Sequence, residues 1–256
     1  MGLVLDRLGN WLGRMLSRPV HVHGSAAPTP PELLLACLRP GDVLLAEGHS
    51  RISSAIKYLT QSTWSHAALF VGDALAGRAP DGHYFIEADI VDGVRSVGVA
   101  RFEGLLTRIC RPSGLTDTDR ERVLAFAIER IGLQYDLRNV LDLARYLLPT
   151  PPVPQRFRRR LIALGSGDPT RAICSTLIAQ AFQSVHYPIL PAISRQAAGG
   201  SQCPACMDEI LHVRNYSLFT PRDFDVSPYF EIVKPGLAGG FDYRGLQWGE
   251  QPGGAN

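Results

Sequence analysis

Two apolar segments constrain the fold of this chain most strongly, one that begins with a histidine and a later one that carries a cysteine. In the first, His66 opens the run His-Ala-Ala-Leu-Phe-Val, which is typical of a strand buried on both faces. In the second, Cys174 stands in the first turn of an apolar stretch that predicts a helix over residues 172–184. A thiol and an imidazole are the two groups that nucleophilic sulfur chemistry requires.

Composition sets the broad limits. The 256 residues suffice for one domain with insertions or for two small domains, and 45% are hydrophobic. The net charge of +2 gives no reason to expect a nucleic-acid partner. Five cysteines are an odd number without a dense, even spacing, which favours a reducing compartment and a cytoplasmic protein. No apolar run approaches the roughly 18 residues that span a bilayer.

Residues 1–31 are expected to form an amphipathic segment followed by a Pro-rich linker. Asp6 and Arg14 are among the polar residues that interrupt its apolar run, so we expect no signal peptide. The helical pattern over residues 3–18 favours docking on the chain's own domain or on a second subunit. The alternative is an anionic surface of the inner membrane, to which the basic run at residues 156–160 would add. The oligomeric state stays open.

The compact domain is predicted over residues 32–235, with insertions near 149–170 and 190–215 and a loose tail over 236–256. Ser50, Thr116 and Thr220 are typical helix caps. Strands are expected over residues 43–47, 66–71, 83–89, 94–99, 106–110 and 229–233.

Glu87 lies in an otherwise apolar stretch, where a carboxylate needs a partner. If the strands at 66–71 and 83–89 pair about a loop centred near residues 76 and 77, His66 falls directly opposite Glu87. Cross-strand neighbours have Cβ atoms roughly 5 Å apart, so the carboxylate could orient the imidazole. The alternative for Glu87 is an ordinary charge at a sheet edge.

Cys174 is predicted at a helix N-terminus, where the dipole and unsatisfied N–H groups favour a thiolate. The same N–H groups could hold the oxyanion of a tetrahedral intermediate. The alternative is a small buried apolar residue with no chemical part. Spacing along the chain does not decide whether Cys174 lies near the hairpin.

Five motifs together resemble the permuted papain-like amidases, the YaeF/YiiX-like branch of the NlpC/P60 superfamily. They are Pro40-Gly-Asp-Val-Leu44, Thr60 to His66, Ile86-Glu-Ala88 with Gly93-Val94, Ile131 to Asp136, and Cys174 to Leu177. The resemblance covers roughly residues 40 to 233. It implies an α+β fold of circularly permuted papain-like type, with helices packed on a small antiparallel sheet.

The same resemblance implies Cys174 as nucleophile, His66 as base and Glu87 as the third polar residue. Tyr135 matches a family tyrosine that lines the cleft or assists the oxyanion, and Ser175 adjoins the nucleophile. The family acts on amide, thioester or ester bonds in substrates from peptides to lipids. We therefore expect a cysteine hydrolase or acyltransferase that needs no metal or organic cofactor. The alternative is a non-catalytic binding or membrane-surface module that retains the fold.

Cys203-Pro-Ala-Cys206 has the spacing of half a zinc site, with His212 as a third ligand candidate. A structural zinc and a disulfide both remain open here. Two idle thiols in a surface loop are the favoured interpretation, because a single Cys-x-x-Cys motif is a weak signal.

Overall fold

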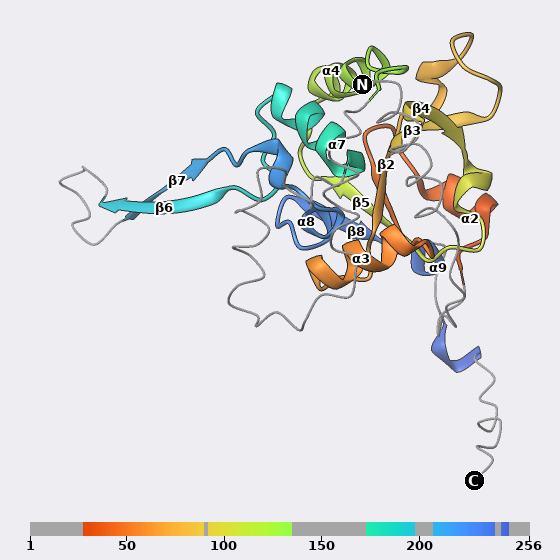
Figure 1. Ribbon diagram of the computed structural model, residues 1–256. Coiled ribbons are helices and arrows are strands. Elements are labelled where there is room, and N and C mark those ends of the chain that lie inside the picture. Colours follow the sequence, from red (N-terminus) through yellow and green to blue (C-terminus); the bar gives the residue numbers. More distant parts are fainter. Residues whose placement is uncertain (1–27, 90–91, 135–172, 198–206, 239–241, 246–256) are drawn as a thin grey trace.

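An antiparallel sheet of six strands organises the molecule (Figure 1). The computed structural model describes residues 28–89, 92–134, 173–197, 207–238 and 242–245. The sheet has the order β4-β3-β2-β1-β5-β8, and every neighbouring pair is antiparallel. Its strands are β1 (Val43–Ala46), β2 (His66–Phe70), β3 (His83–Asp89), β4 (Gly93–Gly98), β5 (Thr107–Pro112) and β8 (Phe230–Val233).

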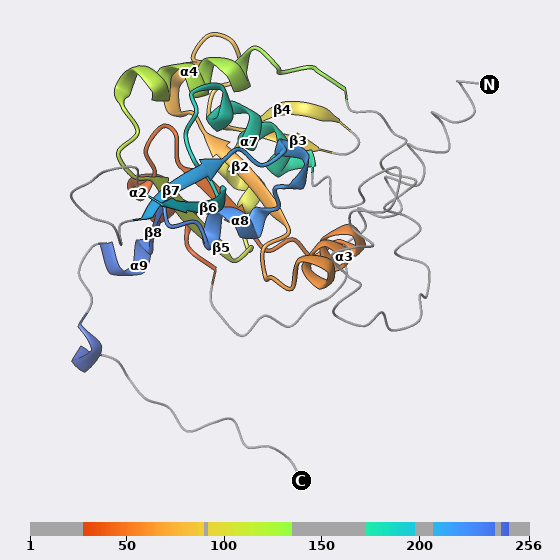
Figure 2. The same ribbon diagram turned by 90° about the vertical axis from the view of Figure 1, so that its left-hand side faces the viewer.

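Helices cover the central strands on both faces (Figure 2). Helix α7 (Ile173–Ser184) packs against β2, β3 and helix α4 (Asp117–Ile128) over one apolar cluster. A second cluster joins the other face of the sheet to α2 (Pro31–Cys37) and the 3-10 turn η2 (Val99–Phe102). Alternate residues of β2 enter the two clusters, which explains why its sequence is apolar throughout. The expected α+β class with helices on a small antiparallel sheet is confirmed.

Capped helices flank the end of the sheet where β2 begins. The Ser50 side chain accepts a hydrogen bond from the Ser53 N–H at the start of α3 (Arg51–Thr60). Thr220 and Asp223, the third residue of α8 (Pro221–Asp225), form a capping box. These local signals were readable in the sequence because a cap uses residues only three positions apart.

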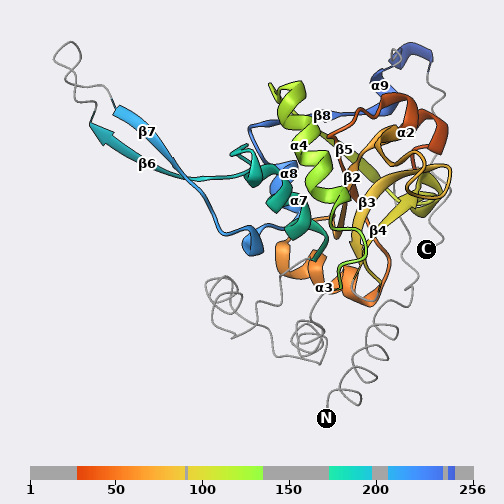
Figure 3. The same cartoon turned by 90° about the horizontal axis from the view of Figure 1, so that it is seen from above.

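The stretch from 190 to 215, predicted as an insertion, carries a second, two-stranded sheet. Strands β6 (Ala192–Ala197) and β7 (Met207–His212) pair antiparallel and project from the body of the molecule (Figures 1 and 3). No alternating pattern marked them, because the arm has no buried face to impose one: Ile193 and its partner Leu211 are both exposed. Three short elements, η3 (Tyr216–Leu218), α9 (Pro235–Ala238) and η4 (Tyr243–Gly245), follow the arm.

Several predictions fall on residues outside the described ranges. They concern the segment at 3–18, the insertion at 149–170 with its basic run at 156–160, and most of the tail. The proposed domain boundaries therefore stay predictions. Among the described residues, no helix combines the length and apolar character that crossing a bilayer requires.

Candidate active site

His66 is the first residue of β2 and hydrogen-bonds to a buried carboxylate. Its Nε2 atom lies 2.6 Å from Oε2 of Glu87, on the neighbouring strand β3. The imidazole ring stacks on Phe102, and 18% of the His66 side chain is exposed. Because an ionised carboxylate only accepts hydrogen bonds, Nε2 carries the hydrogen and donates it to Glu87. This contact leaves Nδ1 as the ring nitrogen for a second partner.

The register of the β2–β3 hairpin differs from the predicted one by two residues. Ala68, rather than His66, pairs directly with Glu87. The 3-10 turn η1 (Gly72–Leu75), with Leu75 buried, makes the connecting loop asymmetric about its middle, which the sequence did not reveal. Side chains alternate with a period of two, so His66 still faces Glu87 as a diagonal neighbour and the contact survives.

Glu87 is fully buried and is held by two arginines that the sequence reading missed. Its Oε1 atom accepts hydrogen bonds from Arg95 Nε at 2.9 Å and Nη2 at 2.7 Å, and from Arg101 Nε at 3.3 Å. Arg95 is the direct β4 partner of Glu87. The sequence did contain a signal for these partners. A buried carboxylate needs cations, and two arginines follow Glu87 shortly afterwards in the chain.

The charge state of Glu87 follows from these partners. Burial by itself raises the pKa of the carboxyl group, but the hydrogen bond and the charge of His66 oppose it, together with the two arginines. The net effect holds the pKa of Glu87 well below its usual range. The carboxylate is therefore ionised at neutral pH and attracts a proton to the adjacent imidazole.

Cys174, the second residue of α7, is the other partner of His66. Its side chain is 5% exposed and hydrogen-bonds to the imidazole ring. Since Glu87 occupies Nε2, Nδ1 is the ring nitrogen left for the sulfur. The structure thus brings Cys174, His66 and Glu87 into one continuous chain of hydrogen bonds, across 108 positions of sequence between the sulfur and the ring.

The pKa of His66 reports on this arrangement. Burial lowers the pKa of the ring, yet hydrogen bonds to Cys174 and Glu87, and the charges on both, outweigh that effect. Together they raise the pKa of His66 from 6.5 to about 10. The imidazole is consequently protonated at neutral pH, between a carboxylate on one side and a sulfur on the other.

Ser175 ties the cysteine helix to the neighbouring loop. Its side chain is fully buried, and its hydroxyl donates a 2.8 Å hydrogen bond to the carbonyl of Phe219, just before α8. The first turn of α7 is thereby fixed to the segment that carries α8. An oxyanion contact from this residue would come from its backbone N–H, because the hydroxyl is engaged elsewhere.

Of the remaining predicted candidates, the structure describes only His212. Tyr135, Cys203 and Cys206 are outside the described residues. His212 lies on the projecting arm, where Nε2 is 2.7 Å from the hydroxyl of Ser194. Within the described ranges, no three His, Cys, Asp or Glu side chains gather as a metal site would require.

A cysteine on a helix that faces a histidine on an antiparallel sheet agrees with the papain-like class that the sequence resemblance implied. The model of one family, described as "Permuted papain-like amidase enzyme, YaeF/YiiX, C92 family", matches residues 37–146. The resemblance that the sequence motifs indicated is confirmed, and it supports a cysteine hydrolase of the amidase and peptidase type in general.

Two individual proteins are similar to this chain. The "Probable lipoprotein peptidase YaeF" of Escherichia coli (strain K12) is 24% identical over 224 residues, covering 80% of this chain and 74% of that protein. A solved structure described as metalloprotein yiiX from Escherichia coli O157:H7 is 15% identical, with a TM-score of 0.44. It covers 77% of this chain and 96% of that one.

Proposed function

We propose that the protein cleaves an amide-type bond through Cys174, His66 and Glu87. The observation that carries this proposal is the hydrogen-bonded chain from the sulfur through the imidazole to a buried, ionised carboxylate. A structural cysteine has no need of such a partner, since a buried thiol packs as a small apolar group.

The chemistry follows from the positions of the three groups. The Cys174 sulfur attacks the substrate carbonyl as a thiolate, because the protonated His66 already holds the thiol proton. His66 then donates that proton to the leaving amine as the carbon–nitrogen bond breaks and a thioester forms on Cys174. A water that gives a proton to His66 hydrolyses the thioester and releases the acid. An alcohol or amine in place of water would make the protein an acyltransferase.

Two features support the roles of the other groups. Glu87 accepts from Nε2 and keeps Nδ1 directed toward the sulfur, while its charge stabilises the imidazolium. Backbone N–H groups at the start of α7 adjoin Cys174 and have no partner within the helix, so they can stabilise the oxyanion.

Alkylation rates test the proposal without knowledge of the substrate. Accessibility alone predicts that iodoacetamide labels the partly exposed Cys37 faster than the buried Cys174. Activation by His66 predicts the reverse, with Cys174 at least about tenfold faster near pH 7. Site-resolved mass spectrometry of the intact protein over time measures both rates.

Substitution of the histidine provides the decisive comparison. His66→Ala should slow labelling of Cys174 by about tenfold or more and leave Cys37 unchanged. His83→Ala is the matched control, since His83 sits on the same hairpin but pairs with the hydroxyl of Ser96 at 3.0 Å. Equal labelling of Cys174 in the wild type and in His66→Ala would contradict the proposal and favour a non-catalytic binding module.

A further inference from the structure

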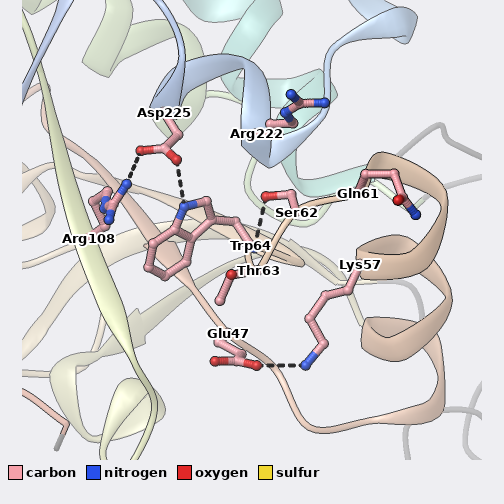
Figure 4. A pocket seen from close by; sticks show the side chains of 9 residues that line it. All are labelled: Glu47, Lys57, Gln61, Ser62, Thr63, Trp64, Arg108, Arg222 and Asp225. Atoms are coloured by element: carbon pink, nitrogen blue, oxygen red, sulfur yellow. Dashed lines mark hydrogen bonds and ion pairs between the residues drawn. The ribbon is translucent and has the colours of Figure 1, made fainter. Parts of the chain in front are cut away.

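A pocket of about 650 Å³ opens between Glu47, Trp64 and Arg222 (Figure 4). Its volume is in the range that holds a small-molecule or short peptide ligand. The lining is polar and charged, and it comes from the end of β1, from α3 and the loop after it, from β5 and from α8. The lining residues are Glu47, Lys57, Gln61, Ser62, Thr63, Trp64, Arg108, Arg222 and Asp225.

The pocket adjoins His66 through short covalent and hydrogen-bonded links. Trp64 in its wall precedes His66 by two residues. Glu47 follows Ala46, which pairs with His66 across β1 and β2. Ser65 holds the backbone on either side of Glu47. Its backbone N–H donates to the Ala46 carbonyl, and its hydroxyl accepts from the Gly48 N–H. This wall and the imidazole therefore belong to one end of the sheet.

The opposite wall is linked to the cysteine helix. Arg222 and Asp225 belong to α8, and the hydrogen bond from Ser175 to Phe219 holds the start of this segment against the first turn of α7. A substrate whose carbonyl lies at Cys174 could thus extend into the pocket.

Most charges of the pocket are already paired within it. Lys57 bonds to Glu47 at 2.8 Å. Arg108 pairs with Asp225, whose second oxygen accepts a 3.0 Å hydrogen bond from the Trp64 indole. Each pair is internally neutral, so these four groups hold the walls together and leave no net charge for a ligand.

Arg222 is the exception. Its Nη1 atom donates a 3.2 Å hydrogen bond to the Thr60 carbonyl, and in the part of the chain that the structure describes it forms no ion pair with a carboxylate. The described lining consequently carries one positive charge in excess, on a planar group that suits a carboxylate. A single excess charge is balanced by a monoanion, whereas a dianion would add repulsion from Glu47 and Asp225.

We propose that this pocket binds the carboxylate of the substrate, so that the protein acts on amides of acidic or carboxylate-terminated molecules, with Arg222 as the specificity residue. The inference rests on the proposed function for the cleavage step, but the binding step is independent of it. Hydrogen-bonding groups at Ser62, Thr63 and Gln61 suit a polar, peptide-like body between the carboxylate and the bond that is cleaved.

Alkylation by reagents with and without a carboxylate tests the pocket. The probes are N-iodoacetyl oligoglycines of one to four residues, each with a free carboxylate or with a carboxamide end. At the probe length that spans the distance from Cys174 to Arg222, the acid should alkylate Cys174 about fivefold faster than the amide. Arg222→Gln should abolish this preference and Arg222→Lys should retain part of it. Arg122→Gln, an equal loss of charge on α4, should not affect it.

A binding measurement separates this inference from the proposed function. Cys174→Ser protein, with Trp11 and Trp248 changed to Phe, is titrated with N-acetyl oligoglycine acids and amides while Trp64 fluorescence is followed. Tighter binding of the acid that depends on Arg222 supports the pocket even where Cys174 proves unreactive. Equal binding of acid and amide, or a preference that survives Arg222→Gln, would overturn the inference even where Cys174 reacts fast.

Discussion

At the scale of single residues, Glu87 and its arginines form a buried polar centre beside His66. The carboxylate has no exposure to solvent and is shared among His66, Arg95 and Arg101. Removal of one partner from a buried charge costs more than the pair itself contributes, because the remaining charge loses its compensation. We therefore expect Arg95 to position His66 through Glu87.

Arg95→Met tests this role. It should lower the free energy of unfolding by about 1–3 kcal/mol, measured by urea denaturation. Arg122→Met is the control, because its exposed ion pair with Asp119 should be worth less than about 1 kcal/mol. A positioning role further predicts slower alkylation of Cys174 in Arg95→Met and partial recovery in Arg95→Lys. Equal stability losses in the two methionine variants would rule it out.

At the scale of elements, the start of β4 sets where Arg95 lies. Gly93 begins β4 with φ of +73°, and a Cβ there would collide with the carbonyl oxygen of Leu133. The two backbones approach closely because the Val94 N–H donates to the Leu133 carbonyl and the Val94 carbonyl accepts from the Gly132 N–H. Glycine is required at 93 for both its left-handed backbone and the space around it.

Gly93→Ala separates these two requirements when compared with Gly114→Ala. Gly114 has φ of +70° and open space where a Cβ would point, so its substitution should cost only the conformational strain of about 1–2 kcal/mol. Gly93→Ala should cost about 1–3 kcal/mol beyond that, from the added collision. Thermal and urea unfolding provide the comparison, and equal costs would mean that the Leu133 segment moves aside freely.

At the scale of the whole molecule, the site should make stability depend on pH. The pKa of His66 is raised from 6.5 to about 10 in the folded state, so its stabilisation is complete below pH 6.5 and is lost as the pH rises through about 10. The pKa of Glu87 is lowered, so its stabilisation is present above its ordinary value of 4.5 and is lost as the pH falls further. Both contributions coincide between about pH 4.5 and 6.5.

Unfolding temperatures across this range provide the measurement. The difference between wild type and His66→Gln should be largest near pH 5–6.5 and should shrink toward pH 10. Proton NMR of the imidazole gives an independent readout, since His66 should stay protonated at pH 8. Titration of His66 near pH 6.5 would contradict this ionised arrangement.

The strands and helices of the described chain were largely readable from the sequence. Apolar runs located β1, β2 and β3, and caps three residues apart located α3, α4 and α8, because such signals depend on neighbouring residues alone. The sequence also identified Cys174, His66 and Glu87 as candidate catalytic residues, each from its neighbours in the chain. The family resemblance implied that they form one site.

Only the tertiary structure decided how these groups meet. The two-residue shift in the hairpin depends on the packing of the η1 loop, and the arginines at Glu87 depend on the β3–β4 register. The contact of Cys174 with His66 and the pocket walls drawn from α3, β5 and α8 join segments far apart along the chain. Such contacts depend on the closure of long loops around a common core, and no local periodicity of the sequence encodes that closure.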